Sequence, residues 1–81
     1  MLILKHLKKN LENKMQHYDA ILKLAPGDVP LVGYRLWGNI FSDRKARFID
    51  GASVYTSVVL SIKATPEATF IQTKNSVYKL A

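Results

Sequence analysis

The spacing of apolar residues changes once along the chain, and the first part has the period of a helix. Over residues 3–25 the apolar positions recur three or four residues apart and are Leu4, Leu7, Leu11, Met15, Tyr18, Leu22 and Ala25. This spacing places them on one stripe of an α-helix. Pro26 disfavours helical backbone in the residue before it, and Gly27 permits an exit turn. The sequence therefore predicts an amphipathic helix over residues 3–25, followed by a connector over residues 26–30.

After this connector the apolar period becomes two, which is typical of β-strands. One face of the first alternating run carries Val32, Tyr34, Leu36 and Ile40, and the other carries Arg35, Trp37, Asn39 and Phe41. A second run starts at Ala52, extends to about residue 64, and carries on its apolar face Val54, Thr56, Val58, Leu60 and Ile62. Tyr55 and Val59 lie on the opposite face of this second run.

Turn signals separate and follow these runs. Asp50–Gly51 is typical of a tight turn, so residues 46–49 are expected to pair with the strand that follows it. Residues 65–68, "TPEA", predict a second turn. Lys74–Asn75 predicts a final hairpin, and Asn75 is able to take a positive φ there. We therefore expect about five antiparallel strands within residues 31–81.

Together these elements predict one α+β domain over residues 1–81, in which the sheet curls into a small SH3-like or Sm-like barrel behind the N-terminal helix. The residues expected in its core are Leu4, Leu11, Met15, Leu22, Leu36, Val54, Val58, Leu60 and Ile62. Trp37, Phe41 and Tyr55 lie on the second face of the sheet. Two interpretations of these aromatic residues stay open: the helix covers them, or they form an exposed binding patch.

Composition sets limits on the class of protein. The chain has no cysteine, which excludes disulfides and thiolate metal sites and fits a reducing compartment. Its apolar start is too short for a signal peptide, and no run approaches the roughly 18 apolar residues of a membrane span, so we expect a cytoplasmic protein. Twelve Lys and Arg against six Asp and Glu give a net charge of +6. This charge favours contact with nucleic acid, anionic lipid or an acidic protein surface, and it also fits plain solubility.

Few residues are arranged for catalysis. His6 and His17 are eleven residues apart, which is about 16 Å on a helix, so they cannot share a metal ion. The carboxylates are scattered, mostly at turns, where aspartate is common for backbone reasons. The serines lack a nucleophile elbow, and the four glycines form no phosphate-binding loop. We therefore expect no enzymatic activity, no cofactor and no metal site.

The segment "DRKAR", residues 43–47, is the most informative charged feature. It follows the strand that carries Trp37 and Phe41. Guanidinium groups beside aromatic rings suit single-stranded nucleic acid, which offers phosphates and bases. A solvated hairpin tip, whose charges prevent aggregation at an edge, explains the same cluster. The candidate binding surface comprises Arg35, Trp37, Phe41, Arg44, Lys45, Arg47 and Tyr55.

The C-terminal part carries a resemblance to a known group of proteins. The pattern Asp50-Gly51-x-x-Val54-x-Thr56-Ser57-x-Val59, followed by Thr73-x-Asn75-Ser76-x-Tyr78-x-Leu80, resembles short uncharacterised bacterial proteins of phages, plasmids and other mobile elements. It covers about the last 35 residues, consists of strand and turn positions, and implies no catalytic residues. The order of one helix and five bent strands is also similar to the Sm-like RNA-binding barrels, whose sequence motifs this chain lacks.

These observations favour a non-catalytic binding module with a protein partner, as an accessory protein of a mobile element. Single-stranded nucleic-acid binding through the basic and aromatic surface is the alternative. Self-association is a related hypothesis, because a thin core gains from burying a strand edge or an aromatic patch in a dimer. We do not expect a membrane partner. The predicted helix carries the cations Lys5, Lys8, Lys9, Lys14 and Lys23, but its far face holds histidine and asparagine instead of a dense lysine row.

Overall fold

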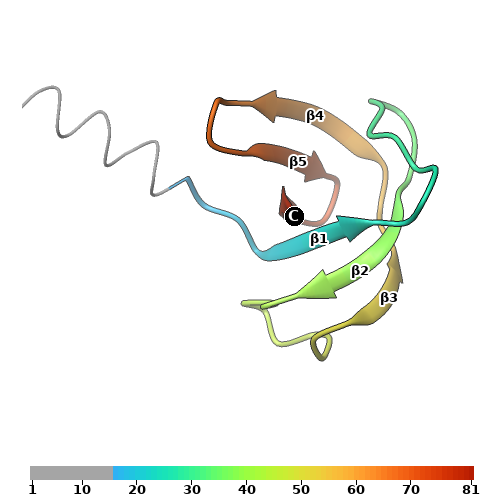
Figure 1. The fold of residues 1–81 in the computed structure, drawn as a ribbon, viewed down its shortest axis with the longest axis vertical. Coiled ribbons are helices and arrows are strands. Elements are labelled where there is room, and N and C mark those ends of the chain that lie inside the picture. The colour runs from blue at the N-terminus through green and yellow to red at the C-terminus, as the bar shows by residue number, and fades with distance from the viewer. Residues whose placement is uncertain (1–15) are drawn as a thin grey trace, which may run out of the picture.

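A computed structural model describes residues 16–81, and within that range the chain forms six β-strands and no helix. The strands are β1 (Ala20–Leu24), β2 (Trp37–Phe41), β3 (Ala52–Tyr55), β4 (Val59–Ala64), β5 (Thr69–Thr73) and β6 (Val77–Leu80). They form one sheet in the order β3-β2-β1-β6-β5-β4, so that β3 and β4 are its edges. Figure 1 shows that this sheet is strongly curled, with β4 and β5 above β1 and with β2 and β3 below it.

The sheet consists of two antiparallel units that meet at one parallel pair of strands. β1, β2 and β3 follow one another in sequence and pair antiparallel, as do β4, β5 and β6. The units are joined by β1 and β6, which run parallel with Ala20 opposite Tyr78 and Leu22 opposite Leu80. The N–H of Ala81 extends this pairing by donating to the Leu22 carbonyl at 2.9 Å. The first and last strands of the described chain therefore lie side by side.

The core lies on the inner face of the curled sheet. The residues buried there are Ala20, Leu22, Leu36, Ile40, Val54, Val59, Ile71 and Tyr78. β1 and β2 approach closely because Gly38 has no side chain, and a Cβ at that position would lie 2.5 Å from the backbone oxygen of Lys23. The predicted burial of Leu22, Leu36 and Val54 is confirmed.

The predicted α+β fold class is wrong. The sheet is open at β3 and β4, so it is not an SH3-like or Sm-like barrel, and it is mixed instead of antiparallel. The helix expected over residues 3–25 is overturned where the structure describes it, because residues 16–19 are irregular and β1 follows them. The rest of that helix, with the expected core residues Leu4, Leu11 and Met15, lies outside the described residues. Within residues 16–81, no helix has the length and apolar character needed to cross a membrane.

The apolar residues of the β1 segment fit both the period of a helix and the period of a strand. Leu22 continues the helical spacing that passes through Tyr18. Ala20 and Leu22 also lie two residues apart, and both are fully buried on one face of the strand. Periodicity alone cannot assign so short an apolar run. Here β1 pairs with β2 on one side and with β6 on the other, so backbone pairing decides the outcome.

The long strand expected from Ala52 to about residue 64 is in fact β3 and β4, whose buried positions are out of phase. Val54 and Thr56 are buried, and the next buried residue is Val59. The chain bends over residues 56–58, and the pairing of β4 with β5 has an irregular step after Val59. The phase of the buried positions therefore changes within the bend, before β4 begins. The expected core residues that prove to be partly exposed are Val58, Leu60 and Ile62, at 37%, 53% and 38%.

The predicted turns are confirmed. Gly51, at the tight turn before β3, has a φ of +87°. The turn between β4 and β5 is closed by a 2.8 Å hydrogen bond from the Thr65 N–H to the Ala68 carbonyl. A hydrogen bond of the same length, from the Thr73 N–H to the Ser76 carbonyl, closes the hairpin between β5 and β6. Turn residues therefore indicated the chain reversals correctly.

Two local predictions are wrong. The hairpin at Lys74–Asn75 also forms without a positive φ at Asn75; among the described residues other than glycine, only Ser42 and Ala46 have one. Residues 46–49 form no strand and belong to the loop before β3. The strand expected from residue 31 begins only at Trp37, because residues 31–34 turn through Gly33, whose φ is +91°.

A pair of alanine substitutions tests the phase of β4. Val59→Ala should lower the free energy of unfolding by about 1–3 kcal/mol, because this side chain is fully buried. Leu60→Ala should change it by less than about 0.5 kcal/mol, because the Leu60 side chain is already 53% exposed. Urea unfolding followed by circular dichroism measures both. A larger loss for Leu60→Ala than for Val59→Ala would restore the alternation expected from the sequence.

Candidate binding surface

Trp37 and Tyr55 form an exposed aromatic pair on the outer face of β2 and β3. They lie directly opposite each other in the antiparallel register, with ring centroids 4.3 Å apart and ring planes at 20°. The guanidinium carbon of Arg35 lies 5.1 Å from the centroid of the Tyr55 ring, which is within the range of a cation–π contact. Trp37 is 53% and Tyr55 49% exposed. We refer to Arg35, Trp37 and Tyr55 as the aromatic stack.

The backbone register brings the two rings together. The N–H of Thr56 donates to the Leu36 carbonyl at 2.8 Å, so these two residues form a hydrogen-bonded pair. Pairs alternate along an antiparallel ladder, and the neighbouring pair, Trp37 with Tyr55, is therefore not hydrogen-bonded. In such pairs the Cα atoms are only about 4.5 Å apart and the side chains are in close contact. The stack follows from strand pairing and does not need burial.

A carboxylate from the segment between β1 and β2 fixes the backbone of Trp37 on its other side. The Trp37 N–H donates to Asp28 Oδ2 at 2.6 Å, and the Ala25 N–H donates to the Trp37 carbonyl at 2.9 Å. Asp28 is brought into place by the turn at Gly27, whose φ is +88°. The role of Asp28 could not be predicted from the sequence, because its partner lies nine residues away in another element and no local pattern links the two.

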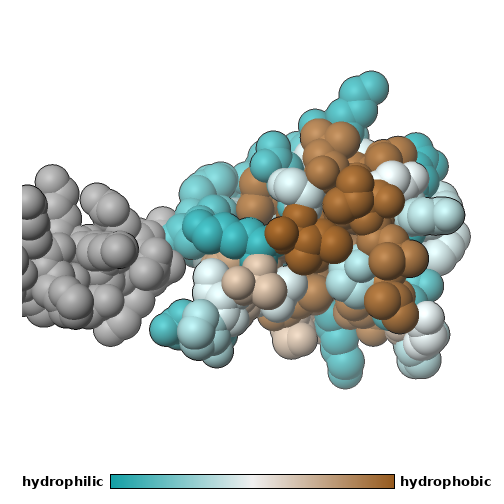
Figure 2. All heavy atoms as spheres, turned by 90° about the horizontal axis from the view of Figure 1, so that it is seen from above, coloured by the Kyte–Doolittle hydropathy of each residue, from teal (hydrophilic) through white to brown (hydrophobic). Residues whose placement is uncertain are grey.

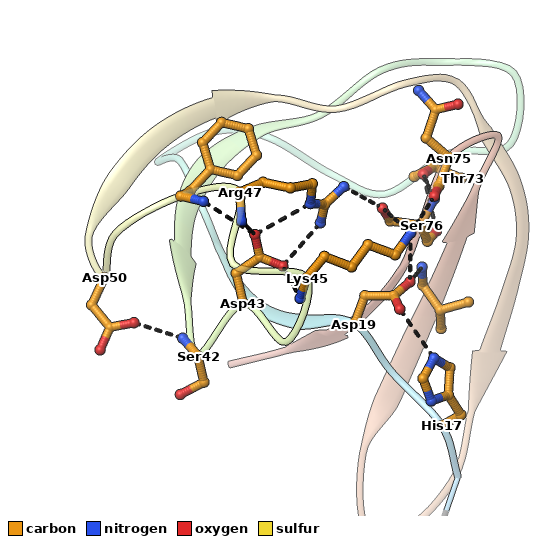
Figure 3. Close-up of polar contacts among 12 residues, drawn as sticks. His17, Asp19, Ser42, Asp43, Lys45, Arg47, Asp50, Thr73, Asn75 and Ser76 are labelled. Atoms are coloured by element: carbon orange, nitrogen blue, oxygen red, sulfur yellow. Dashed lines mark hydrogen bonds and ion pairs between the residues drawn. The ribbon is translucent and has the colours of Figure 1, made fainter.

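Asp43 organises the loop that contains the basic cluster (Figure 3). Its carboxylate accepts hydrogen bonds from the N–H groups of Lys45, Arg47 and Phe48, at 3.2, 2.9 and 3.2 Å, and from the Arg47 guanidinium at 3.2 Å. The Asp43 side chain is only 1% exposed. These bonds hold a loop in which Ala46 has a φ of +53°, a left-handed conformation that costs an ordinary residue about 1–2 kcal/mol.

Two cations of this loop reach the hairpin between β5 and β6. Figure 3 shows both side chains directed toward Ser76. Arg47 Nη1 donates to Ser76 Oγ at 2.7 Å, and Lys45 Nζ donates to the Asn75 carbonyl at 2.9 Å. Lys45 Nζ also lies 3.6 Å from Asp19 Oδ2. The charges of Lys45 and Arg47 are therefore paired with carboxylates and tie the loop to the sheet.

The third cation of the loop lies against an aromatic ring. The guanidinium carbon of Arg44 is 4.1 Å from the centroid of Tyr18, and the Arg44 N–H donates to the Asp19 carbonyl at 2.7 Å. The ammonium of Lys79 lies 5.6 Å from the same ring. All three basic residues of the loop thus make contacts within the described part of the chain.

Hydrogen bonding lowers the pKa of both carboxylates in this network. The side-chain bond from Arg47 is the largest influence on Asp43; burial opposes it, and backbone N–H groups add to it, so the pKa of Asp43 falls below 3.8. Burial acts to raise the pKa of Asp19. The Val77 N–H, the His17 ring and the Lys45 ammonium together outweigh it, and the pKa of Asp19 is also lowered from 3.8. Asp43 in turn raises the pKa of Arg47.

The structure divides the predicted surface into separate groups. Arg35, Trp37 and Tyr55 lie together where β2 begins. Phe41 lies on the same outer face but at the other end of this five-residue strand, about 13 Å away at the usual rise per residue. The loop that carries Arg44, Lys45 and Arg47 follows Phe41. The basic cluster and the aromatic stack are therefore held at opposite ends of β2.

A second exposed surface consists of large apolar side chains on the segment between β1 and β2 and on β4. Figure 2, which views the molecule from above Figure 1, shows apolar side chains gathered on this side. The N–H of Gly33 donates to the Val59 carbonyl, and the N–H of Val59 to the Tyr34 carbonyl, both at 2.8 Å, so the two segments are neighbours. We refer to these residues as the apolar patch: Leu31, Val32, Tyr34, Val58, Leu60 and Ile62.

Four carboxylates of the described chain accept hydrogen bonds from backbone N–H groups. Asp19 accepts from Val77, Asp28 from Trp37, Asp43 from Arg47 and Asp50 from Ser42, at 2.8, 2.6, 2.9 and 2.7 Å. The exposed His17 ring contacts Asp19 Oδ1 at 3.0 Å. Within residues 16–81, no three histidine or carboxylate side chains are grouped so that they could hold a metal ion. These side chains are placed to stabilise turns and loops.

Comparison with known proteins gives no relatives: no family model, no curated protein and no solved structure matches this chain. The resemblance to proteins of mobile elements therefore stays a prediction.

The lowered pKa values predict how stability depends on pH. A carboxylate whose pKa is lower in the folded than in the unfolded chain stabilises the fold above its unfolded pKa. That stabilisation is lost as the pH falls from about 3.8 through the folded value. Asp43→Asn should therefore unfold at lower urea concentration at pH 7, and its stability should decline less than that of the wild type between pH 5 and pH 2.

Glu67→Gln is the control for this experiment, because it removes one negative charge at an exposed turn position that makes no hydrogen bond within the described residues. Urea unfolding at several pH values measures all three proteins. An Asp43→Asn profile parallel to that of the wild type would contradict the assigned role of Asp43.

Proposed function

We propose that this chain is a non-catalytic binding module that contacts a protein partner through the aromatic stack. The observation that carries this proposal is the exposed pairing of Trp37 and Tyr55 at 4.3 Å, with Arg35 beside the pair. Tryptophan, tyrosine and arginine are the residue types most enriched among those that dominate binding energy in protein interfaces. Here strand register holds the two rings against each other, and Arg35 contacts the Tyr55 ring, before any partner arrives. This arrangement lowers the entropy lost on binding.

The apolar patch supports the same function as the surroundings of the stack. It is continuous with the stack along one ladder, in which Tyr34 bonds to Val59, Leu36 bonds to Thr56, and β2 then pairs with β3. Monomeric proteins rarely expose apolar patches larger than a few hundred Å² unless the patch has a role in binding. The patch consists mainly of aliphatic side chains, and leucine and valine are under-represented among dominant interface residues. We therefore place the centre of the contact at the stack.

The arrangement of polar side chains supports a role without catalysis. Asp19, Asp28, Asp43 and Asp50 each accept a backbone hydrogen bond, which favours the charged form and commits the side chain to a loop or turn. A general base needs an accessible lone pair that is aimed at a substrate. Asp28 is the carboxylate that contacts the stack, and it is bonded to the Trp37 backbone.

Trp37→Ala should abolish capture of the partner protein. The full chain is used as bait in a cell extract, and bound proteins are quantified by mass spectrometry for the wild type, Trp37→Ala and Phe48→Ala. Phe48 is the matched control, because it is also an aromatic residue about half exposed, at 45%, and it lies outside both the stack and the apolar patch. We expect a partner that the wild type and Phe48→Ala retain and that Trp37→Ala loses by at least about tenfold, as for a dominant interface residue. If Trp37→Ala retains every specifically bound protein, the proposed function is wrong.

Single-stranded nucleic acid is the second candidate ligand of the aromatic stack. A half-exposed tryptophan beside a guanidinium is suited to stacking on a base while an arginine contacts phosphate. Arg35 makes no ion pair with any carboxylate of residues 16–81. The charges of Lys45 and Arg47, in contrast, are paired with Asp19 and Asp43. Any phosphate contact at this site would therefore come from Arg35 more than from the loop.

A salt titration with a labelled oligothymidylate tests this second candidate. If the stack takes single strands, Arg35→Gln should reduce the slope of log affinity against log salt by about 0.7, the value of one phosphate contact on a single strand. Lys45→Gln should leave the slope unchanged, since Lys45 is bonded to Asn75 and paired with Asp19. An equal reduction by both substitutions would place nucleic-acid binding on a general basic surface instead.

A further inference from the structure

The two edges of the sheet differ in how they are protected. Exposed edges offer unpaired N–H and C=O groups, and proteins guard them with charges, proline, bulges or covering segments. β4 has three such guards: Lys63, the irregular step after Val59, and the turn at residues 33–34, which pairs with Val59 through two 2.8 Å bonds. β3 has the sequence Ala-Ser-Val-Tyr, without charge, proline or bulge. No strand of the described chain pairs with its outer side, as Figure 1 shows.

The backbone groups that point outward from β3 can be identified from the ladder. The Thr56 N–H points toward β2, because it donates to the Leu36 carbonyl. N–H and C=O directions alternate along an antiparallel strand. Ser53 and Tyr55, which lie opposite Asn39 and Trp37 in non-hydrogen-bonded pairs, therefore direct their N–H and C=O groups to the free edge. Each of the two residues offers one donor and one acceptor to an added strand.

The aromatic stack lies directly beside this edge. A strand added to β3 would place a side chain about 4.5–5.5 Å from that of Tyr55 on the same face of the sheet. The guanidinium of Arg35 lies 5.1 Å from the Tyr55 ring and forms no ion pair within residues 16–81. A carboxylate on the added strand is therefore the partner that Arg35 lacks.

Charge decides between two occupants of the edge. A second copy of the chain would bring together two molecules with a net charge of +6 each, which repel one another. An acidic segment is attracted by the same charge, and it satisfies Arg35 and the backbone of β3 together. The short length of β3, four residues, limits the number of backbone bonds, so the stack must contribute to affinity.

We infer that β3 is a docking edge for an extended acidic peptide segment of a partner protein, which adds to the sheet beside Tyr55 and contacts Arg35. This inference rests on the proposed function and names the class of partner. Backbone bonds to Ser53 and Tyr55 hold the peptide in the mode of strand addition, and side chains on one of its faces contact the stack.

The probe is an eight-residue peptide that alternates glutamate with valine and contains one tyrosine, with both ends blocked. Trp37 is the only tryptophan of the chain, so its fluorescence reports binding at the stack. Two further peptides carry N-methyl groups on alternate residues, on the odd residues in one and on the even residues in the other. Only one edge of the peptide pairs with β3, so one methylated peptide should lose binding and the other should keep it. A peptide with lysine in place of glutamate should not bind.

Substitutions in the full chain test the same edge from the other side. Ser53→Pro removes an outward N–H, which an edge strand tolerates, and should weaken peptide binding by about tenfold or more. Ser53→Ala keeps this N–H and loses the same contact from Asn39 Nδ2 to Ser53 Oγ, so it is the matched control and should bind as the wild type does. Arg35→Gln should weaken binding and reduce its dependence on salt. Circular dichroism determines whether each variant is folded. If Ser53→Pro does not fold, the methylated peptides still test the inference.

Several results would overturn the inference. The first is no saturable change in fluorescence up to about 1 mM peptide, the limit of weak specific binding. The second is equal binding of the two methylated peptides. The third is a dimer in light scattering that the peptide does not dissociate. The proposed function can fail separately. If Ser53→Pro still captures from an extract the partner that Trp37→Ala loses, the stack binds a protein but β3 is not its docking edge. If Trp37→Ala loses no protein, the proposed function fails whatever the peptides do.

Discussion

The parallel pairing of β1 with β6 is the interaction on which the rest of this fold depends. Each antiparallel unit of three strands has one apolar face, which must be buried against another element. Leu22 and Ile40 belong to one unit and Ile71 and Tyr78 to the other, and the curled sheet buries all four on one face. Asp19 joins the units twice: its N–H donates to the Val77 carbonyl at 2.7 Å, and its carboxylate accepts the Val77 N–H at 2.8 Å.

The same junction explains why the basic loop and the aromatic stack have different roles. Asp19 also accepts the Arg44 N–H on its carbonyl and lies near the ammonium of Lys45. The positive charge of Lys45 thus compensates the negative charge of Asp19, which is needed where the two units of the sheet join. The stack is held differently, by strand register and by a bond from Asp28 to the backbone of Trp37. Its rings and its guanidinium are therefore not needed to close any junction of the described sheet.

The sequence predicted local features better than long-range ones. Turns at Gly51 and at the two later hairpins depend on residues next to one another, so these turns could be predicted from the local sequence. β1 was assigned to a helix because a short apolar run fits both periods, and its partner β6 lies more than fifty residues away. The predicted phase of β4 failed at the bend over residues 56–58, because the apolar alternation that starts at Ala52 continues through these residues and gives no sign that one strand ends and another begins.

The candidate site was predictable in its residue types but not in its arrangement. Arg35, Trp37 and Tyr55 were identified as surface candidates, and alternation places them outward. The sequence could not show that Lys45 and Arg47 are paired with Asp19 and Asp43, because Lys45 and Asp19 are brought together only when the units join. Nor could it show that Asp28 supports Trp37, a contact between a turn and a strand.

Stability accounts for only part of the aromatic stack. The alternation that turns Val54 inward necessarily turns Tyr55 outward, so an exposed residue at this position is unavoidable. Stacking between neighbouring strands adds about 0.5–1.5 kcal/mol, which explains a pair of aromatic rings even on an exposed face. It does not explain an arginine at the pair without a carboxylate from residues 16–81. Within residues 16–81 aspartates satisfy backbone N–H groups and pair with Lys45 and Arg47, whereas Arg35 has no ion pair there. Arg35 stands beside β3, an edge strand that has no charged residue, no proline and no strand of the described chain on its outer side. The unmatched charge and the unpaired backbone lie at the same place, and both are satisfied by one acidic strand.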